Sequence, residues 1–502
     1  MPSANVPPRP ERVAPVGLSR IAAVAGAPDT GTDTAVTGVT HDSRAVRPGD
    51  LYAALPGARV HGAAFAAEVA SAGAVAALTD PAGADAVRAA GLVPVVVDDP
   101  RAVLGPVAAA VYGNPADGLL LLGTTGTNGK TTTSYLIEAG LRAAGHRTGL
   151  VGTVETRVGD EVLPSVRTTP EATDLQALFA VMRERGVAAA AMEVSSHALA
   201  LGRVLGTTFR AVGFTGLSQD HLDFHRDLED YFLAKAALFA PGYAPLGVVV
   251  ADEPWGQRLL QISGIPVRSL TTTVAGDWQV SRVQVDAEGA SHFELDGPAG
   301  RLAAAVALPG AFNVLNAALA IAMLVEAGVD AELAVRGVSG VRAVPGRMER
   351  VDAGQRFLAL VDYAHSPDAV ERVLVEARRL AGHEGRVIGV LGCGGDRDAD
   401  KRPLMGAALA DGADIAVLTS DNPRSEDPEA ILAAMQAGVT REDGVLVDPD
   451  RASAIRAAVR AAAPGDVVVI LGKGHEQGQE SGGTVTPFDD RDVLRQAIRE
   501  LA

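Results

Sequence analysis

Cysteine is almost absent from this chain of 502 residues, which contains Cys393 and no second cysteine. An internal disulfide is therefore impossible, and we expect the protein to work in a reducing compartment. No apolar run reaches the ~20 residues that a membrane-spanning helix needs. The first residues, MPSANVPPRPERVAP, lack the apolar centre of a signal peptide. The sequence predicts a cytoplasmic protein that does not insert into a membrane.

Basic residues are also too few to balance the acidic ones. The chain has 44 Lys and Arg against 61 Asp and Glu, a formal net charge of −17. A surface of this sign repels nucleic acid and anionic membranes, so neither is an expected partner. If the substrates are anionic, Lys and Arg must be concentrated at the site that binds them.

Apolar strands alternate with helical stretches along most of the chain, which predicts an α/β protein of three domains. We expect a disordered tail at 1–20, a small N-terminal α/β domain at 21–116, a central domain at 117–342 and a C-terminal domain at 343–502. Strands such as VAAAAMEV are apolar throughout, which indicates mainly parallel sheets covered on both faces. The C-terminal strands predict a doubly wound, Rossmann-like sheet whose ligands bind beyond the carboxyl ends of the strands. The segment WQVSRVQVDAEGASHFELDG alternates with period two and predicts a hairpin insert.

The segment GTTGTNGKTTT begins at Gly123, after the apolar run LLLLG and before the predicted helix TTTSYLIEAGLRAAG. Its glycines depart from the usual Walker A spacing, since Thr124 occupies the place of the first one. The context is nevertheless that of a phosphate loop, because glycines let backbone N–H groups approach phosphate oxygens and a helix N-terminus favours anions. Lys130 would reach the β- and γ-phosphates, and Thr131 would offer a hydroxyl to Mg²⁺. A turn that merely caps a helix is the competing interpretation.

Four further motifs in the central part leave alternatives open. Glu193 in MEVSSH ends a strand and could bind Mg²⁺ or be a surface carboxylate. DHLDFH, at 220–225, could hold a metal, with Zn²⁺ better suited to its histidines, or form a polar loop. Lys235 in YFLAKAALF is most simply a lysine that snorkels from an apolar helix. Asn313 and Asn316 share one face of a predicted helix, where they could contact adenine or cap the helix.

Two C-terminal motifs predict a site for an amino acid. SDNPR supplies Asp421, Asn422 and Arg424 at the end of one apolar strand, and GKGHE supplies Glu476 at the end of another. Arg binds carboxylates bidentately, whereas Asp and Glu attract an ammonium, so together they suit a zwitterionic group. The loop GGDRDADKRP, which begins near Arg397, concentrates cations at a third strand end. Exposed ion pairs are the alternative for each motif.

The motifs together resemble the Mur ligases of bacterial cell-wall synthesis, and among them the members that add diaminopimelate. The resemblance extends over nearly the whole chain except the tail. Its motifs include DSRAVRPGDLYAALPG, GTTGTNGKTTT, RTTPEA, MEVSSHAL, DHLDFH, YFLAKAALF, FNVLNA, PGRME, VDYAHSPDA, GCGGDRDADKRP, DNPRSEDP and GKGHE, in the order found in that family. GTNGKTT alone would indicate only a wider family that includes folylpolyglutamate synthases, whereas DNPR favours diaminopimelate over lysine.

The resemblance implies ATP- and Mg²⁺-dependent amide formation in the synthesis of a peptidoglycan precursor. The γ-carboxylate of D-Glu in UDP-MurNAc-L-Ala-D-Glu would take the γ-phosphoryl group of ATP, and 2,6-diaminopimelate would attack the acyl phosphate. This route is chemically reasonable because phosphorylation removes the charge that repels a nucleophile and supplies a leaving group. We also expect a monomer.

The resemblance also implies a role for individual residues. In the central P-loop ATPase domain, the catalytic positions are Lys130, Glu193, His221 and Lys235. Lys235 matches a lysine that is carbamylated to N6-carboxylysine, so the implied metal-associated positions are Thr131, Glu193, His221 and Lys235. Nucleotide binding is implied for Gly126, Thr127, Asn128, Gly129, Lys130, Thr131, Thr132, Asn313, Arg347, Asp362 and His365. The UDP-MurNAc-dipeptide would contact Ser43, Arg44, Thr168, Thr169, Ser195 and Arg203. Diaminopimelate would contact Arg397, Asp421, Asn422, Arg424, Gly472 and Glu476.

One position departs from the family pattern. Many relatives have Asn where this chain has Gly216, in FTGLSQDHLD, and the loss of that side chain removes local hydrogen bonds. The alternatives to a diaminopimelate-adding enzyme are a lysine-adding or other Mur-type ligase and a non-catalytic nucleotide-binding member of the family. A GTPase-type switch is not supported, because the chain has no NKxD motif.

Overall fold

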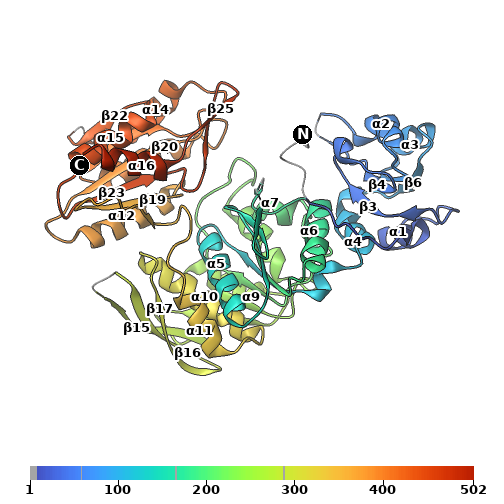
Figure 1. Cartoon of the computed structure of the whole chain (residues 1–502), viewed down its shortest axis with the longest axis horizontal. Helices are drawn as coiled ribbons and strands as arrows, with labels where there is room; N and C mark the ends of the chain where they lie inside the picture. Colours follow the sequence, from blue (N-terminus) through green and yellow to red (C-terminus); the bar gives the residue numbers. More distant parts are fainter. Residues whose placement is uncertain are drawn as a thin grey trace.

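The computed structural model describes residues 8–57, 59–163, 165, 167–286, 289–441 and 443–501. Its three larger sheets belong to three successive parts of the chain, which we call the N-terminal, central and C-terminal units. Figure 1 shows the N-terminal unit in blue at one end of the molecule and the C-terminal unit in orange and red at the other. Within the described residues, no helix combines the length and apolarity needed to cross a membrane.

The N-terminal unit is a parallel sheet of four strands in the order β3-β4-β5-β6. Leu51 and Ala53 face one apolar cluster, whereas Tyr52 between them faces another, so helices cover both sides. The strands are β3 (Gly38–Thr40), β4 (Asp50–Ala53), β5 (Ala76–Thr79) and β6 (Val93–Val96). The helices are α1 (Leu18–Ala25), α2 (Ala66–Ser71), α3 (Ala84–Ala89) and α4 (Pro100–Val111).

Part of the segment that we expected to be a disordered tail is ordered, so the prediction of a tail at 1–20 is wrong for its later residues. The strand β1 (Val16–Gly17) pairs with β2 (Ala35–Val36), and α1 begins at Leu18. The Arg9 guanidinium donates to both carboxylate oxygens of Asp50, at 2.7 and 2.8 Å. The composition of the tail could not reveal this, because a buried carboxylate on a distant strand supplies the partner.

The central unit has the sheet order β10-β9-β8-β11-β7-β12-β13-β14-β15-β16-β17. Pairing is parallel from β8 to β15 and antiparallel at both edges. The inner strands are β7 (Leu120–Thr125), β8 (Thr148–Val151), β11 (Ala189–Glu193), β12 (Ala211–Phe214), β13 (Gly247–Val250) and β14 (Val267–Thr271). The edge strands are β9 (Thr156–Val158), β10 (Glu161–Leu163), β15 (Trp278–Val285), β16 (Ser291–Gly297) and β17 (Gly300–Val306). The predicted hairpin is confirmed in β15 and β16, although it continues the main sheet and is not a separate insert.

Both faces of the central sheet are buried, as its apolar strands predict. Leu122 faces one cluster and Leu121 the other, because successive side chains of a strand point to opposite faces. One face packs against α5 (Lys130–Ala143), α10 (Ala311–Glu326) and α11 (Ala331–Ser339). The other packs against α6 (Ala172–Glu184), α7 (Ser196–Ala200), α8 (Leu228–Ala236) and α9 (Pro254–Ile262).

The C-terminal unit has the predicted doubly wound form. Its sheet order is β18-β19-β23-β20-β21-β22, and all neighbours are parallel except the edge strand β18. The strands are β18 (Glu349–Arg350), β19 (Leu358–Asp362), β20 (Val387–Cys393), β21 (Ile415–Ser420), β22 (Val445–Val447) and β23 (Val467–Leu471). The helices are α12 (Pro367–Ala381), α13 (Lys401–Gly412), α14 (Pro428–Gln436), α15 (Arg451–Ala461) and α16 (Asp490–Arg499).

A fully buried ion pair joins two strand ends of this unit. Arg451 donates through Nε and Nη2 to both carboxylate oxygens of Asp490, each at 2.7 Å. The same guanidinium donates to the carbonyl oxygens of Ser420, at 3.2 Å, and Leu471, at 2.8 Å. Because these residues end β21 and β23, Arg451 holds together the strand ends from which SDNPR and GKGHE emerge.

Replacing Arg451 by Met should destabilise the C-terminal unit by about 3–5 kcal/mol, because it leaves the Asp490 carboxylate buried without a counter-charge. Hydrogen exchange of the β21 and β23 amides would measure this loss. Arg456→Met is the matched control on the same helix: Arg456 pairs with Glu500 at 3.3 Å at the surface, so its loss should cost less than about 1 kcal/mol. Equal protection of these amides from hydrogen exchange in the Arg451→Met and Arg456→Met variants would contradict the prediction.

Candidate functional site

The structure has three adjoining cavities, and the C-terminal cavity lies between the other two. The phosphate-loop cavity has a volume of about 230 Å³, the C-terminal cavity about 460 Å³ and the N-terminal cavity about 700 Å³. Arg167 lines both the C-terminal and the N-terminal cavity. The phosphate-loop and C-terminal cavities share Thr168, Ser195, Asp220, His221, Tyr363 and His365. The shared walls indicate one extended site with three parts.

The phosphate loop lies between the end of β7 and the start of α5 at Lys130. Gly126 has φ +148° and Gly129 has φ +88°, and a Cβ at Gly126 would collide with the Thr215 hydroxyl. These positions therefore need glycine. The Lys130 ammonium donates to the carbonyl oxygens of Gly126 and Thr127, both at 2.8 Å, so its charge lies at the N-terminus of the helix.

A second buried lysine reaches the same carbonyl. Lys235, on α8, donates to the Gly126 oxygen at 2.8 Å, and its Nζ lies 4.3 Å from the centre of the Tyr231 ring. Burial, followed by the nearby charge of Lys130, lowers the pKa of Lys235 well below its usual range. Burial also lowers the pKa of Lys130. Both effects disfavour the charged form of Lys235, so its amine loses a proton more readily than that of an exposed lysine. Because the side chain is buried, the prediction of a simple snorkelling lysine is wrong.

Oxygen groups lie on the wall near the two lysines. Glu193, at the end of β11, accepts from the backbone N–H and the hydroxyl of Thr153, both at 2.8 Å. The Thr131 hydroxyl accepts from the Arg347 guanidinium at 2.9 Å. In the parts of the chain that the structure describes, no group of three His, Cys, Asp or Glu side chains is arranged to hold a metal. DHLDFH therefore does not form the zinc-type cluster that its composition allows.

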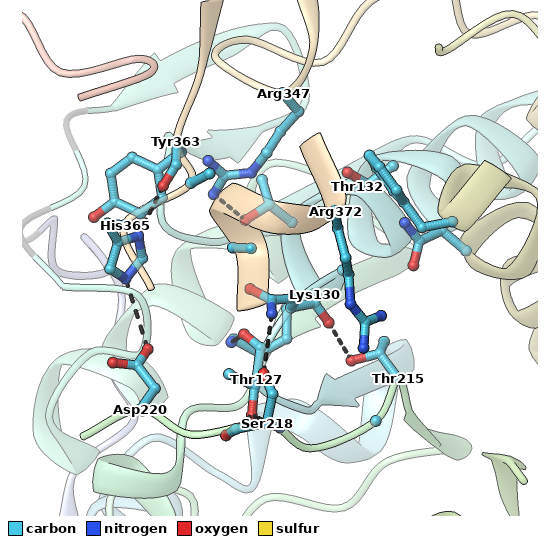
Figure 2. A pocket seen from close by; sticks show the side chains of 18 of the residues that line it. Thr127, Lys130, Thr132, Thr215, Ser218, Asp220, Arg347, Tyr363, His365 and Arg372 are labelled. Carbon is cyan, nitrogen blue, oxygen red and sulfur yellow. Dashed lines mark hydrogen bonds and ion pairs between the residues drawn. The ribbon is translucent and has the colours of Figure 1, made fainter. Parts of the chain in front are cut away.

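Asp220 lies where the central and C-terminal units meet. Its carboxylate is 3.6 Å from His221, 3.7 Å from His365 and 3.8 Å from Lys401, and Figure 2 shows the pair with His365. Burial raises the pKa of Asp220, but the His365 hydrogen bond and the charges of these partners outweigh burial and hold it well below its usual range. Asp220 is therefore an anion that binds the two units together.

The phosphate loop also contacts the C-terminal unit directly. The side-chain amide of Asn128 donates to Asp368 at 3.2 Å. Arg372, next to the loop in Figure 2, donates to Glu253 at 3.0 Å. The Arg347 guanidinium lies 4.5 Å from the centre of the Tyr363 ring. These contacts place C-terminal side chains over the loop.

Two more predicted positions end or follow β19. Asp362 accepts backbone N–H bonds from Met348, at 2.7 Å, and Ala364, at 2.8 Å. Burial nevertheless raises its pKa. His365 Nδ1 lies 2.8 Å from the Tyr363 carbonyl, so this nitrogen carries a proton, and Nε2 lies 3.7 Å from the Asp220 carboxylate.

All six residues predicted for the amino acid line the C-terminal cavity: Arg397, Asp421, Asn422, Arg424, Gly472 and Glu476. The Asn422 amide donates to Glu476 at 2.8 Å. Lys473 is an addition that sequence reasoning missed. Its buried ammonium donates to the Asn422 side-chain oxygen at 3.0 Å and to Glu476 at 3.1 Å. The motif GKGHE contained this lysine, but only the fold shows that it points inward.

A short hairpin fixes the backbone of the DNPR motif. It consists of β24 (Gly478–Ser481) and β25 (Thr484–Pro487). The Gln479 amide donates to the Asp421 carbonyl at 2.8 Å, and the Glu480 N–H donates to the Asn422 side-chain oxygen at 3.0 Å. The Arg424 N–H donates to the Glu480 carbonyl at 3.0 Å. Arg424 has φ +54°, so the hairpin holds it in a conformation that L-residues seldom adopt.

The residues predicted for the UDP-sugar peptide divide between two cavities. Ser43 and Arg44 line the N-terminal cavity, from the turn Ser43–Ala45. The other four line the C-terminal cavity: Thr168, Thr169, Ser195 and Arg203. Arg203 pairs with Glu171 at 2.8 Å. Since Glu171 lines the N-terminal cavity, this ion pair connects the predicted substrate residues of the two cavities.

Asn313 does not line the phosphate-loop cavity. It is buried, donates to the Pro309 carbonyl at 2.6 Å and accepts from Asn316 at 2.9 Å. Asn316 is the member of the pair on the cavity wall. Gly126 is also not among the residues that line this cavity, and neither is Lys235, whereas the remaining predicted nucleotide positions line it.

The comparisons with known proteins agree along the chain. Three family models match: Mur ligase family, catalytic domain, at 35–112; Mur ligase middle domain, at 124–324; and Mur ligase, glutamate ligase domain, at 346–474. The UDP-N-acetylmuramoyl-L-alanyl-D-glutamate–2,6-diaminopimelate ligase of Streptomyces coelicolor is 57% identical over 98% of each chain. The chain belongs to the Mur ligase family. The ligase of the same name from Corynebacterium glutamicum is 48% identical over 93% of each chain.

Solved structures support the fold of this Mur ligase. A UDP-N-acetylmuramoyl-L-alanyl-D-glutamate–2,6-diaminopimelate ligase is 31% identical with a TM-score of 0.67, covering 97% of this chain and 99% of its own. MurF ligase from Thermotoga maritima in complex with ADP is 16% identical with a TM-score of 0.63, covering 93% and 97%. At that identity the second likeness concerns the fold alone.

The departure at Gly216 has a structural counterpart in this Mur ligase. Gly216 has φ +122°, where an L side chain would be strained. Its carbonyl accepts the Thr127 N–H at 3.0 Å. The main chain at this position thus supports the phosphate loop without a side chain.

Replacing His475 by Gln should make the stability of this Mur ligase less dependent on pH. Burial, followed by the charges of Arg347 and Arg491, lowers the pKa of His475 to about 3, whereas an unfolded histidine has a pKa of about 6.5. Between these values the unfolded chain binds one more proton, so stability falls as pH falls, by up to about 1.4 kcal/mol per pH unit. Melting temperatures from pH 7.5 to 5 should therefore fall more steeply for the natural protein. Identical slopes would contradict this account.

Proposed function

We propose that this protein is an ADP-forming ligase that joins 2,6-diaminopimelate to the γ-carboxylate of D-Glu in UDP-MurNAc-L-Ala-D-Glu, a step of peptidoglycan precursor synthesis. The observation that carries the proposal is the shared wall between the phosphate-loop cavity and a C-terminal cavity with groups for both charges of an amino acid. The names of relatives at up to 57% identity support it. We infer that it acts in the cytoplasm as a monomer, since one chain supplies all three cavities.

Each of the three domain ranges proposed from the sequence binds a different substrate. Residues 21–116 bind the uridine nucleotide, 117–342 bind ATP and 343–502 bind the amino acid. ATP phosphates lie against the N–H groups from Thr127 to Thr132, which line the cavity, and against the Lys130 ammonium. Arg347, Asp362 and His365 contact the nucleotide from the C-terminal unit, and Asn316 takes the place on the cavity wall that the sequence suggested for Asn313.

Mg²⁺ suits the oxygen groups of the loop, provided that Lys235 is modified. Two lysines on one carbonyl repel a cation, whereas a carbamate on Lys235 would contribute oxygen ligands of the kind that Mg²⁺ prefers. Thr131, Glu193 and the carbamate would hold the ion, with His221 beside them. Bound there, Mg²⁺ would offset negative charge on the phosphates. The modification is feasible because the depressed pKa of Lys235 leaves an amine that can attack CO₂, forming an N–C bond and releasing a proton.

The protein's main work in the reaction is alignment and stabilisation of charge. Lys130 and Arg347 face the phosphoryl group as it moves from ATP to the D-Glu carboxylate. The incoming amine then attacks the acyl phosphate, the amide bond forms and phosphate leaves.

The far end of diaminopimelate explains the composition of the C-terminal cavity. Arg424 and Arg397 pair with its carboxylate, and Asp421 and Glu476 attract its ammonium. Lysine has an amine but no second carboxylate at its far end. If lysine bound in the same direction, the cavity arginines would lose this partner.

Phosphate release with ATP, Mg²⁺ and UDP-MurNAc-L-Ala-D-Glu should require diaminopimelate, and lysine should be a poor substitute. Arg424→Ala should raise the KM for diaminopimelate roughly 10- to 100-fold, the loss expected for a paired charged hydrogen bond, with little change in the KM for ATP. Colorimetric phosphate release with each amino acid would measure both.

Arg460→Ala is the control for that experiment, because Arg460 is an exposed arginine of α15 outside the cavities. It should behave as the natural protein does. Equal losses of ATP and diaminopimelate use in Arg424→Ala would refute the role of Arg424. Activity with lysine alone would identify a lysine-adding ligase, and binding of both substrates without phosphate release would identify a non-catalytic member.

Lys235→Arg should lower kcat by about 100-fold or more, since arginine keeps the positive charge but cannot form the carbamate that stabilises charge in the reaction. Incubation with ¹³C-bicarbonate should give a carbamate resonance in the natural protein that the variant lacks. Lys401→Arg, which alters a lysine outside the phosphate loop, should keep the resonance. A natural protein without it, or a fully active Lys235→Arg, would argue against carbamylation.

A further inference from the structure

We propose that residues 8–12 form a strap that shapes the binding site of the UDP-sugar substrate, with Arg9 as its positioning residue. The inference rests on the proposed function, which places this substrate in the N-terminal cavity. The strap adds a substrate-positioning element from a segment whose sequence predicted only disorder.

The strap is anchored in the N-terminal unit by Arg9. The side chain of Arg9 is 9% exposed and that of Asp50 is 3% exposed. Asp50 accepts the bidentate hydrogen bonds from Arg9 and also a hydrogen bond from the Arg47 N–H at 2.8 Å. A charge-assisted, bidentate and buried pair is stiff and specific in its geometry. A disordered tail would not place a guanidinium in this way.

Arg9 also contacts both ends of the segment that lines the cavity. Its guanidinium donates to the Val39 carbonyl and to the Ala45 carbonyl, each at 3.4 Å. Residues 40–45, which include Ser43 and Arg44, line the N-terminal cavity. The two carbonyls thus mark the start and the end of the loop that faces the substrate, and one side chain sets the distance between them.

The strap also contacts helix α6 of the central unit. The backbone N–H groups of Glu11 and Arg12 donate to the Glu184 carboxylate at 3.0 and 2.7 Å. Glu184 is the last residue of α6, and α6 also supplies Asp174 and Leu178 to the cavity wall. Pro8 itself lines the cavity. The strap therefore connects the N-terminal unit with α6 of the central unit, and it adjoins the cavity at Pro8.

A link between the two units that form the cavity limits their relative motion, which the substrate would otherwise have to restrict on binding. Pre-ordering of this kind improves affinity without a new contact to the ligand. The affected ligand is the UDP-sugar peptide, since ATP and the amino acid occupy the other two cavities. The strap should therefore act on one substrate and not on the other two.

The test compares full-length variants by steady-state kinetics, by calorimetric binding of UDP-MurNAc-L-Ala-D-Glu and by melting temperature. Arg9→Met should raise both the KM and the Kd for this substrate roughly tenfold, leaving the KM for ATP and diaminopimelate unchanged. Arg9→Lys should recover part of the loss. Glu184→Ala removes only the exposed anchor and should raise the same two constants a few-fold without lowering the melting temperature.

Arg12→Ala is the matched control, because it changes an exposed side chain of the strap but keeps the backbone N–H. It should leave every constant unchanged. If Arg9→Met and Glu184→Ala alter stability or kcat but not the KM and Kd for the UDP-sugar peptide, the strap supports only the fold and the proposal is overturned. Calorimetry needs no turnover, so a natural protein without phosphate release would contradict the ligase activity while the Kd values still decided the role of the strap.

Discussion

The convergence of two buried lysines on the carbonyl of Gly126 is the constraint around which the phosphate loop is built. Lys130 and Lys235 come from different helices, and each donates to this oxygen at 2.8 Å. Two ammonium groups at one acceptor are electrostatically unfavourable. Burial, followed by the charge of Lys130, lowers the pKa of Lys235, and burial lowers the pKa of Lys130. Anionic phosphates beside Lys130 and a carbamate on Lys235 would each add negative charge here. The charges that the proposed reaction brings to the loop would therefore offset the repulsion between its two lysines.

The phosphate loop lies between the central and C-terminal units, so side chains of both units surround its two lysines. Arg347, Asp368 and His365 belong to the C-terminal unit, and each contacts the loop or the Asp220 carboxylate next to it. The amino-acid cavity shares walls with the loop because the strand ends β19, β21 and β23 face the same region. An acidic protein can thereby concentrate its few cations where anionic substrates meet, although its overall charge of −17 would repel them.

Local chemistry in the sequence predicted the parts of the site that lie at strand ends. Runs of apolar residues located the parallel strands, and polar motifs directly after them had to face one edge of each sheet. The six amino-acid residues therefore line one cavity, as expected. The sequence could not distinguish Asn313 from Asn316, since both lie on one helix face and only tertiary packing decides which reaches the cavity. It also could not reveal Arg9, whose partner Asp50 is 41 residues away, or the buried direction of Lys473.

Most of the strained backbone conformations outside glycine lie at or next to this site. Six non-glycine residues of the described chain have a left-handed φ, and four of them are His221, Met348, Asp396 and Arg424. His221 and Arg424 line the cavities, and Met348 and Asp396 adjoin Arg347 and Arg397, which also do. Each such residue costs on the order of 1–3 kcal/mol, so neighbouring contacts must hold it in place. The hairpin at Arg424 and the Asp362 bond to the Met348 N–H are such contacts. The regular sheets therefore stabilise the fold. The strained residues near the carboxyl ends of their strands reduce that stability, and they orient the side chains that contact the substrates.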